Sequence, residues 1–283
     1  MRKMKKAKSL NIKGKLVTLD EPWIMGILNV TPDSFYAASR VEEESEIYKR
    51  IETILLEGGR IVDIGGCSTR PGAYIPTEEE ERERLEGVLS ILMHHYPGVI
   101  VSVDTFRANI ARWAVEEYGA SIINDVSGGD MDPEMFRTIA DLRIPYIIMH
   151  MRGTPETMQS MTTYENVTAE VLQSLATKMD QLYQLGVNDV IVDPGFGFSK
   201  TVAQNYELMR HLSDFRILEA PLLVGVSRKK MVYETLETTP ENSLNGTTVL
   251  NAFSLLQGAD ILRVHDVRAA VEAVRITQLL KEE

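Results

Sequence analysis

The chain has 283 residues, of which 44% are hydrophobic and 25% charged, and its formal net charge at pH 7 is −11. This length suits one (β/α)8 barrel or two ordinary domains, and it allows a large core without disulfides or metals. The acidic balance argues against a nucleic-acid partner, and the lack of any run of about 18 apolar residues argues against a membrane span.

The first 20 residues are set apart from the rest of the chain. We expect residues 1–20 to form an N-terminal extension, because alternating apolar residues around Lys13 and Gly14 are typical of a β-hairpin. We expect this hairpin to lie at the bottom of one domain formed by residues 21–283, in which no Gly-, Ser- or Pro-rich linker occurs. No apolar stretch follows the basic first residues, so no secretory signal is predicted.

Eight short apolar runs alternate with segments of helix length. The runs are IMGIL (24–28), IVDI (61–64), VIVSV (99–103), SIIN (121–124), YIIM (146–149), VIV (190–192), LLVGV (222–226) and ILRV (261–264). This alternation predicts repeated βα units with a parallel sheet. Eight units favour a closed (β/α)8 TIM barrel over an open sheet.

Two of the intervening segments carry signals for the start of a helix. Thr77 and Glu80 have the spacing of a capping box, in which each side chain bonds the other residue's backbone N–H. Asp132 followed by Pro133 is typical of a cap and a first helical residue. Apolar residues at helical spacing follow both, so we expect amphipathic helices that pack on the strands.

Polar residues follow all eight apolar runs. In chain order they are Asn29; Gly65 and Gly66, then Ser68, Thr69 and Arg70; Asp104; Asn124 and Asp125; His150; Asp193; Ser227, Arg228 and Lys229; and His265 and Asp266. In a barrel of this type the carboxyl ends of the strands form one rim, where the active site lies. The sequence therefore predicts an active site at this rim.

Three basic side chains predict an anion site on the rim. Lys229 follows the seventh run, and Arg263 and His265 end the eighth. Such barrels often bind phosphate between these two loops, and Arg and Lys supply the donors. We expect Asp266 to cap the last helix, whose N-terminal amides would face the same anion. The alternative is ordinary charge flanking a helix.

Asp104, Asn124 and Asp193 indicate recognition of a heterocycle. Each ends an apolar run, and a buried carboxylate is costly unless it accepts strong hydrogen bonds. A ring edge that carries N–H and NH2 donors would satisfy a carboxylate with two bonds. The alternative is that these side chains cap helices or pair with Arg107.

The first two loops of the rim suit a phosphate ligand with a metal. Residues 29–35 (NVTPDSF) are rich in oxygen, the ligand that Mg2+ prefers. Residues 65–72 hold three glycines and Arg70, a composition suited to a mobile loop that faces phosphate. Cys67 has no evident base beside it, so we expect no nucleophile there. A single cysteine allows no intrachain disulfide, which favours a reducing, cytoplasmic compartment.

At these residues the sequence resembles the dihydropteroate synthase family over roughly residues 20–280. The matching segments are GILNVTPDSF (26–35), DIGGCSTRPGA (63–73), SVDTFR (102–107), INDVSGG (123–129), DPGFGF (193–198), GVSRK (225–229) and RVHD (263–266). The resemblance implies a (β/α)8 barrel that joins 6-hydroxymethyl-7,8-dihydropterin diphosphate to 4-aminobenzoate. The products would be 7,8-dihydropteroate, a folate precursor, and pyrophosphate, with Mg2+ as cofactor.

The resemblance also implies a role for each matching residue. The pterin would be held by Asp104, Asn124, Met149, Asp193, Gly225, Lys229 and Arg263. The diphosphate would be held by Asn29, Arg70, Arg263 and His265, with Mg2+ at Asn29. The aminobenzoate would be surrounded by Thr69, Arg70, Pro71, Phe196, Ser227 and Lys229. Catalysis would fall to Asp104, Asp193, Lys229, Arg263 and His265, with no protein nucleophile.

The family further implies a cytoplasmic homodimer that is a sulfonamide target. Four apolar residues at helical spacing, Val249, Leu250, Phe253 and Leu256, would either pack internally or lie across a twofold interface. The sequence alone leaves both arrangements open.

Two departures and two alternatives accompany the resemblance. After NVTPDSF the family often continues Ser-Asp-Gly-Gly, whereas residues 36–39 are YAAS, and Ser199 follows GFGF where glycine is common. Neither replaces a residue assigned to chemistry. A pterin-dependent methyltransferase acting with a corrinoid protein is one alternative, and a non-catalytic pterin-binding barrel is the other. Neither requires the diphosphate residues Asn29, Arg70 and His265.

Overall fold

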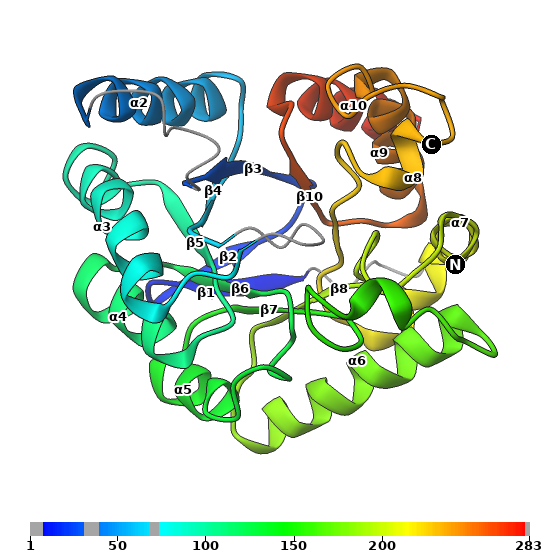
Figure 1. The fold of residues 1–283 in the computed structure, drawn as a ribbon, viewed down its shortest axis with the longest axis horizontal. Helices are drawn as coiled ribbons and strands as arrows, with labels where there is room; N and C mark the ends of the chain where they lie inside the picture. Colours follow the sequence, from blue (N-terminus) through cyan, green and yellow to red (C-terminus); the bar gives the residue numbers. More distant parts are fainter. Residues whose placement is uncertain (1–7, 31–39, 68–73, 281–283) are drawn as a thin grey trace.

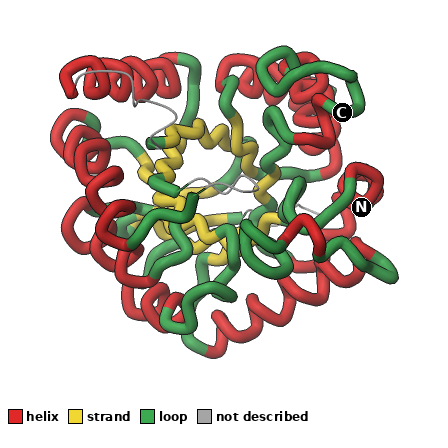
Figure 2. The backbone as a smooth tube through the Cα atoms, viewed as in Figure 1, coloured by secondary structure: helices red, strands yellow, loops and turns green. Residues whose placement is uncertain are grey.

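The computed structural model describes residues 8–30, 40–67 and 74–280. In these residues eight parallel strands form a central ring, and helices surround it (Figure 1, Figure 2). The strands are β3 (Trp23–Asn29), β4 (Ile61–Gly65), β5 (Ile100–Asp104), β6 (Ile122–Asp125), β7 (Tyr146–Met149), β8 (Val190–Asp193), β9 (Leu223–Val224) and β10 (Ile261–Val264). The predicted (β/α)8 TIM barrel is confirmed. Across the described ranges, no helix combines the length and apolar character needed to cross a membrane.

The ring closes between β8 and β9. The sheet order is β8-β7-β6-β5-β4-β3-β10-β9, with parallel neighbours throughout. Val192 of β8 forms a parallel bridge with Leu222, and its N–H donates to the Pro221 carbonyl at 2.9 Å. β9 is shorter than the seventh apolar run because Val226 already starts a turn. The carbonyl of Val226 accepts from the Lys229 N–H at 3.2 Å.

Helices connect successive strands on the outside of the ring. They are α2 (Arg40–Leu56), α3 (Glu78–His95), α4 (Ala108–Tyr118), α5 (Met135–Leu142), α6 (Val167–Gln184), α7 (Val202–Arg210), α8 (Lys230–Tyr233), α9 (Leu244–Gln257) and α10 (Val267–Leu279), with 3-10 turns η1 (Met158–Ser160) and η2 (Leu212–Leu218). Their apolar faces and the outward side chains of the strands form the main hydrophobic core. The helices thus fix the strand ends from outside the barrel.

The two predicted helix starts have different outcomes. The capping box of α3 is confirmed: Thr77 Oγ accepts from the Glu80 N–H at 3.2 Å, and the Glu80 carboxylate accepts from the Thr77 N–H at 2.8 Å. At Asp132 the expected cap bond is present, because its Oδ1 accepts from the Glu134 N–H at 3.0 Å, but α5 begins only at Met135, after a turn at residues 133 and 134. Asp132 Oδ2 also accepts from the N–H of Ala108, the first residue of the neighbouring helix α4, at 2.7 Å.

The expected N-terminal hairpin is confirmed. It consists of β1 (Ser9–Ile12) and β2 (Lys15–Thr18), which pair antiparallel around Gly14 at a φ of +80°. In Figure 1 the pair lies within the outline of the ring. Leu10 and Ile12 pack on interior side chains from the N-terminal ends of the barrel strands. The whole apolar cluster is Leu10, Ile12, Leu19, Trp23, Met25, Ile61, Ile122, Ile147, Ile191, Leu223 and Ile261. The hairpin therefore plugs the bottom of the barrel.

Above this apolar cluster the barrel interior becomes largely polar, beginning two residues further along the strands. Side chains in a strand alternate between faces, so residues i and i+2 share one face. The apolar layer at the bottom therefore predicts which residues point inward above it. These residues are Asp63, Asn124, Met149, Asp193, Gly225 and Arg263, all buried or half-buried. The candidate site is the upper half of the barrel interior.

Candidate active site

An ion-paired arginine lies at the centre of the rim. Arg263 donates from Nε to Asp63 Oδ2 at 2.7 Å and from Nη2 to Asp104 Oδ2 at 2.7 Å. Asp63 is 0% exposed and Asp104 is buried. Burial raises the pKa of Asp104 to about 7, with the Arg263 charge opposing and Asp63 adding to the rise. Two buried carboxylates are thus held together by one guanidinium.

Asp63 is a site residue that the sequence analysis missed. It lies inside an apolar run, IVDI, and was counted as part of that strand. Its Oδ1 accepts from Ser102 Oγ at 2.6 Å, and the Asn124 amide donates to its two oxygens at 3.3 and 3.5 Å. A carboxylate inside a buried strand needs such partners, and this requirement was the signal that could have identified it.

The pairing of Asp104 with Arg107, one of the alternatives left open, does not occur. Arg107 forms its ion pair with Glu81 of α3 and donates to the Pro76 carbonyl at 2.5 Å. Asp104 faces the barrel interior and pairs with Arg263 instead. The structure thus brings Asp104, Asn124 and Arg263 into one network, in which Arg263 bonds Asp104 and Asp63, and Asp63 also accepts from Asn124.

Asp193 and Lys229 form the opposite side of the barrel mouth. Asp193 is buried, and its Oδ1 accepts from the Gly195 N–H at 2.8 Å. Burial raises the pKa of Asp193, and the charge of Lys229 opposes this rise. Lys229 Nζ donates to the Phe196 carbonyl at 2.5 Å and lies 4.7 Å from the ring centre of Phe198. Burial lowers the pKa of Lys229 to about 8, with Asp193 opposing.

Gly225 lies between the two charged groups. A Cβ added to Gly225 would lie 3.7 Å from Arg263 Cβ and 3.8 Å from Lys229 Nζ. A larger side chain at this position would therefore enter the space between these two cations. The backbone at the end of β9 approaches the site closely because it carries no side chain there.

Ser227 and His265 meet at the rim between β9 and β10. Ser227 Oγ lies 3.0 Å from His265 Nδ1 and accepts from the His265 N–H at 3.2 Å. Burial, the largest effect, lowers the pKa of His265 to about 3, so its imidazole is neutral at pH 7. It can therefore donate one ring N–H to an anion but carries no charge of its own.

The prediction that the Asp266 side chain caps the last helix is wrong. Asp266 occupies the position before α10, but its side chain makes no cap bond. It pairs instead with Arg228, whose Nε and Nη2 donate to it at 3.1 and 2.6 Å. A bidentate pair with arginine is a stronger use of a carboxylate than a single amide bond. The pair ties the loop after β9 to the loop after β10.

Asn29 and Met149 lie on the rim at the ends of β3 and β7. Asn29 Oδ1 and Asp104 Oδ2 lie 3.6 and 3.7 Å from the point where a Cβ of Gly65 would be, on the two strands that flank β4. Met149 is buried in an apolar cluster with Phe106 and Val126. One wall of the mouth is therefore polar and the floor beside it is apolar.

One proposed contact of the aminobenzoate needs correction. The side chain of Phe196 is 0% exposed and belongs to the main hydrophobic core, so only its carbonyl faces the mouth. The half-buried ring of Phe198, two residues later, is the one beside Lys229. Gly197, between them, has a φ of +83°, so the chain turns there and the two rings face different surroundings. Thr69, Arg70 and Pro71 lie outside the described residues.

A buried lysine and histidine beside the site were also missed. Lys200 Nζ lies 3.0 Å from His150 Nδ1 and donates to the Gly195 and Phe198 carbonyls at 2.9 and 3.0 Å. From the sequence, His150 was predicted only to be a polar strand end, and Lys200 was not among the candidate site residues. The signal was a lysine immediately after a glycine-rich loop that begins at a candidate ligand-binding aspartate.

Ser199 is accommodated where the family often has glycine. Its φ is +51°, a conformation that non-glycine residues rarely adopt. Its Oγ accepts from the Arg152 N–H and donates to the Arg152 carbonyl, both at 2.8 Å. These two bonds join the loop after β8 to the loop after β7 and offset the strain.

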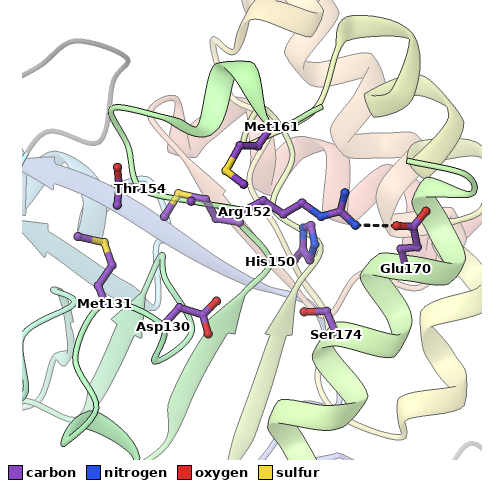
Figure 3. Close-up of a pocket in the computed structure, with 10 residues that line it drawn as sticks. Asp130, Met131, His150, Arg152, Thr154, Met161, Glu170 and Ser174 are labelled. Atoms are coloured by element: carbon purple, nitrogen blue, oxygen red, sulfur yellow. Dashed lines mark hydrogen bonds and ion pairs between the residues drawn. The ribbon is translucent and has the colours of Figure 1, made fainter. Parts of the chain in front are cut away.

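A cavity of about 760 Å³ lies beside this region. Its lining residues are Asp130, Met131, His150, Met151, Arg152, Gly153, Thr154, Met161, Glu170 and Ser174. In Figure 3 His150 lies next to Arg152, whose guanidinium reaches Glu170 of α6 at 2.6 Å. Asp130 is likewise paired, with Lys178 at 2.7 Å. The charged groups Arg152, Glu170 and Asp130 of this cavity thus all form ion pairs with protein side chains.

Cys67 does not provide an activated thiol. Burial raises the pKa of Cys67 to about 12, and the nearby carboxylates of Glu81 and Asp104 raise it further. The thiol therefore stays protonated at neutral pH, and a protonated thiol is a poor nucleophile.

Comparisons with known proteins place this geometry in one family. The model of the pterin binding enzyme family matches residues 25–265. Dihydropteroate synthase of Escherichia coli K12 is 37% identical over 268 residues, covering 94% of each chain, and that of Synechocystis is 38% identical over 261 residues, covering 91% of this chain and 90% of the other.

Solved structures of dihydropteroate synthases are also similar to this chain. Yersinia pestis dihydropteroate synthase in a sulfonamide drug complex superimposes with a TM-score of 0.88 at 36% identity, covering 96% of this chain and 99% of the other. Xanthomonas albilineans dihydropteroate synthase with 4-aminobenzoic acid gives a TM-score of 0.88 at 36% identity, covering 98% and 100%. The chain belongs to the dihydropteroate synthase family of pterin-binding enzymes.

Proposed function

We propose that this chain condenses 6-hydroxymethyl-7,8-dihydropterin diphosphate with 4-aminobenzoate to give 7,8-dihydropteroate and pyrophosphate, a step of folate biosynthesis. The observation that carries the proposal is the network at the barrel mouth. Two carboxylates bound to Arg263 face a third carboxylate, Asp193, which lies beside Lys229. Such a site offers acceptors to a donor-rich ring and cations to a diphosphate.

The pterin would lie across the mouth of the barrel. Its ring N–H and NH2 groups would donate to Asp193 and Asp104, with Asn124 completing the edge. Lys229 would donate to the ring carbonyl, and Arg263 and Met149 would contact the two faces of the ring. The lack of a side chain at Gly225 supports this arrangement, because a Cβ there would lie 3.7 Å from Arg263 Cβ and 3.8 Å from Lys229 Nζ and would take up space beside the ligand.

The diphosphate would lie toward Asn29 and His265, with Arg70 completing the set from outside the described residues. Neutral His265 donates one ring N–H, and Arg263 supplies the charge. Asn29 at the end of β3 offers an amide oxygen that suits Mg2+, because a cation bound by few protein oxygens uses substrate phosphates as its other ligands. When bound, the ion would neutralise charge on the departing pyrophosphate.

The reaction needs no protein nucleophile. The bond between the methylene carbon and the diphosphate oxygen breaks, and its electron pair leaves with pyrophosphate. The carboxylates of Asp104 and Asp193 stabilise the cation that remains on the dihydropterin, because they are fixed in place before the charge develops. The amine nitrogen of aminobenzoate then forms the new C–N bond and loses a proton to solvent.

The aminobenzoate would enter beside Lys229 and Ser227. We replace Phe196 by Phe198 in this pocket, since only the second ring reaches Lys229. Thr69, Arg70 and Pro71 stay part of the proposal. The solved relative from X. albilineans was crystallised with 4-aminobenzoic acid, which supports the choice of this substrate.

We also propose a homodimer in the cytoplasm. Val249, Phe253 and Leu256 of α9 and Ile276 of α10 are exposed, whereas Leu250 is half-buried against the core. These exposed apolar side chains on two contacting helices suit a twofold interface. The single cysteine, which allows no intrachain disulfide, supports a reducing compartment.

Turnover by the purified chain tests the proposed activity. Pterin diphosphate, aminobenzoate and Mg2+ would be supplied, and dihydropteroate and pyrophosphate would be measured together. Equal amounts of both products are expected. Consumption of methyltetrahydrofolate with a corrinoid acceptor, without dihydropteroate, would establish the methyltransferase alternative. Pterin binding without either reaction would establish the non-catalytic one.

A further inference from the structure

Lys200 is a buried lysine whose ammonium group bonds neutral acceptors. It is 6% exposed, and its Nζ donates to the carbonyls of Gly195 and Phe198 at 2.9 and 3.0 Å. Nζ also lies 3.0 Å from His150 Nδ1 and 3.4 Å from the His150 carbonyl. An ammonium group has three N–H donors and no acceptor, so the three nearest contacts use all of them. The loop after β8 folds around this group.

The same loop carries two side chains of the proposed site, Asp193 and Phe198. Asp193 begins it, and the Gly195 N–H donates to Asp193 Oδ1 at 2.8 Å. Gly195 thus bonds the carboxylate through its N–H and Lys200 through its carbonyl. Phe198, whose ring lies against Lys229, is fixed to Lys200 through its own carbonyl.

The backbone of this loop contains one disfavoured conformation, at Ser199, whose φ is +51°. Gly195 and Gly197 also have positive φ, at +71° and +83°, which glycine adopts without strain. A Cβ on Gly195 would come within 2.0 Å of the His150 carbonyl, so the loop is also pressed against the end of β7. The Ser199 conformation persists because surrounding bonds fix the loop, and Lys200 supplies two of them, to the Gly195 and Phe198 carbonyls.

The charges around Lys200 agree with this role. Burial lowers the pKa of Lys200 to about 7; the nearby carboxylate of Asp193 opposes the fall, and the cations Lys229 and Arg152 add to it. His150 is neutral, since burial and the charges of Lys200, Lys178 and Arg152 lower its pKa to about 2. Its Nδ1 therefore accepts from Lys200, and its other face lines the cavity of Figure 3.

We propose that Lys200 is a positioning residue for pterin binding: by holding the Gly195 and Phe198 carbonyls it fixes the Asp193 carboxylate and the Phe198 ring in their binding positions. The inference rests on the proposed function only in taking Asp193 as a pterin ligand. Lys200 itself touches no substrate in this account, and His150 acts as the acceptor that orients it.

The test is a double-mutant cycle on pterin affinity, measured by calorimetry. Lys200→Met keeps the length of the side chain but removes the donor, and we expect about tenfold to a hundredfold weaker pterin binding, as for lost hydrogen bonds that involve a charged group. If Lys200 acts through Asp193, the double variant Lys200→Met, Asp193→Asn should bind within about threefold of Asp193→Asn alone. Multiplied losses, or unchanged affinity in folded Lys200→Met, would overturn the proposal.

Lys178→Met is the matched control. Lys178 is also a buried lysine; it donates to the Ser127 carbonyl at 2.9 Å and to Asp130 at 2.7 Å, away from Asp193. Its loss should lower thermal stability but change pterin affinity by less than about twofold. An equal loss of affinity in this control would show that any buried lysine suffices, and would contradict a specific role for Lys200.

A second variant and a wild-type measurement complete the experiment. If circular dichroism shows that Lys200→Met does not fold, Lys200→Gln, which retains a neutral N–H donor, enters the same cycle under the same criteria. Wild-type pterin binding is measured in parallel. Absence of binding in the wild type would refute the proposed function, whereas wild-type binding with an unaffected Lys200 variant would refute only this inference.

Discussion

The bottom and the rim of the barrel are built from the same strands. On β4, Ile61 belongs to the apolar bottom layer, and two residues later Asp63 belongs to the charged network. On β10, likewise, Ile261 belongs to the apolar layer and Arg263, two residues later, to the charged network. At the bottom, apolar side chains of the hairpin β1–β2 exclude water. At the rim, the buried charged side chains are held by ion pairs or hydrogen bonds to other protein groups.

This difference shows how one interior serves stability and function separately. An apolar layer is stabilised in proportion to the area it buries, and it tolerates exchange among similar side chains. Buried charges cost free energy unless each is paired, and removing one partner leaves the others exposed to that cost. We therefore expect substitutions at the bottom to change stability alone, and substitutions at the rim to change pterin binding.

The largest effect is expected for Arg263→Met. It leaves Asp63 and Asp104 buried without their shared cation, so the free energy of unfolding should fall by about 3–5 kcal/mol, and turnover should be lost. Denaturant unfolding and the product assay measure the two. Arg112→Met, which breaks exposed pairs with Glu116 and Asp141, is the control and should cost at most about 1 kcal/mol. Equal costs for the two variants would contradict the account of the rim.

The opposite end is tested with Leu10→Ala. Leu10 is 1% exposed in the bottom cluster, and its truncation should lower the free energy of unfolding by about 2–5 kcal/mol through lost burial and a cavity. Because the pterin site is made two residues above this layer, pterin affinity of the folded variant should match the wild type. A parallel loss of affinity would mean that the hairpin shapes the site, and the separation of the two ends would be wrong.

Asp193→Asn should have the opposite effect to Leu10→Ala, with weaker pterin binding and nearly unchanged stability. An amide accepts on one atom only, so one donor of the pterin loses its partner and binding should weaken by about 1.5–3 kcal/mol. Stability should change little, because burial already raises the pKa of this carboxylate and disfavours its charge. Calorimetry and thermal unfolding on the same sample separate the two effects. Wild-type affinity in a folded variant would remove Asp193 from the site.

The smallest expected effect concerns pH. His150 has a pKa lowered to about 2, whereas an unfolded histidine has one near 6.5, so below pH 6.5 only the unfolded chain takes up this proton. Stability is therefore lost as pH falls through this window, by about 2 kcal/mol from this residue between pH 6.5 and pH 5. His150→Gln should lose that part of the slope, and Leu10→Ala should keep it. Parallel pH profiles for the wild type and His150→Gln would contradict a neutral buried imidazole.

Sequence patterns were sufficient for the fold because they are periodic. The eight apolar runs, the hairpin around Gly14 and the capping box at Thr77 all follow from spacing within one segment. The missed features depend on contacts between segments. Asp63 meets Arg263 across 200 residues, and Lys200 meets His150 across 50, so no local pattern marks either pair.

Two local assignments were incomplete for the same reason. Asp132 has the residue type of a cap and bonds the Glu134 N–H, but its other oxygen bonds Ala108 at the start of α4. Phe196 matches the family motif, yet only the three-dimensional path of its loop shows that its ring enters the core and that of Phe198 does not. A motif fixes which residues are near a site, and the fold decides which atoms face it.

A crystal structure of the chain with bound pterin diphosphate tests the central claim most directly. The account predicts the pterin ring in the barrel mouth, with its N–H and NH2 groups within hydrogen-bonding distance of the Asp193 and Asp104 carboxylates and its carbonyl near Lys229 Nζ. A ring bound instead in the cavity of about 760 Å³ beside His150 and Arg152 would contradict it, because the network around Arg263 would then have no part in recognising the substrate.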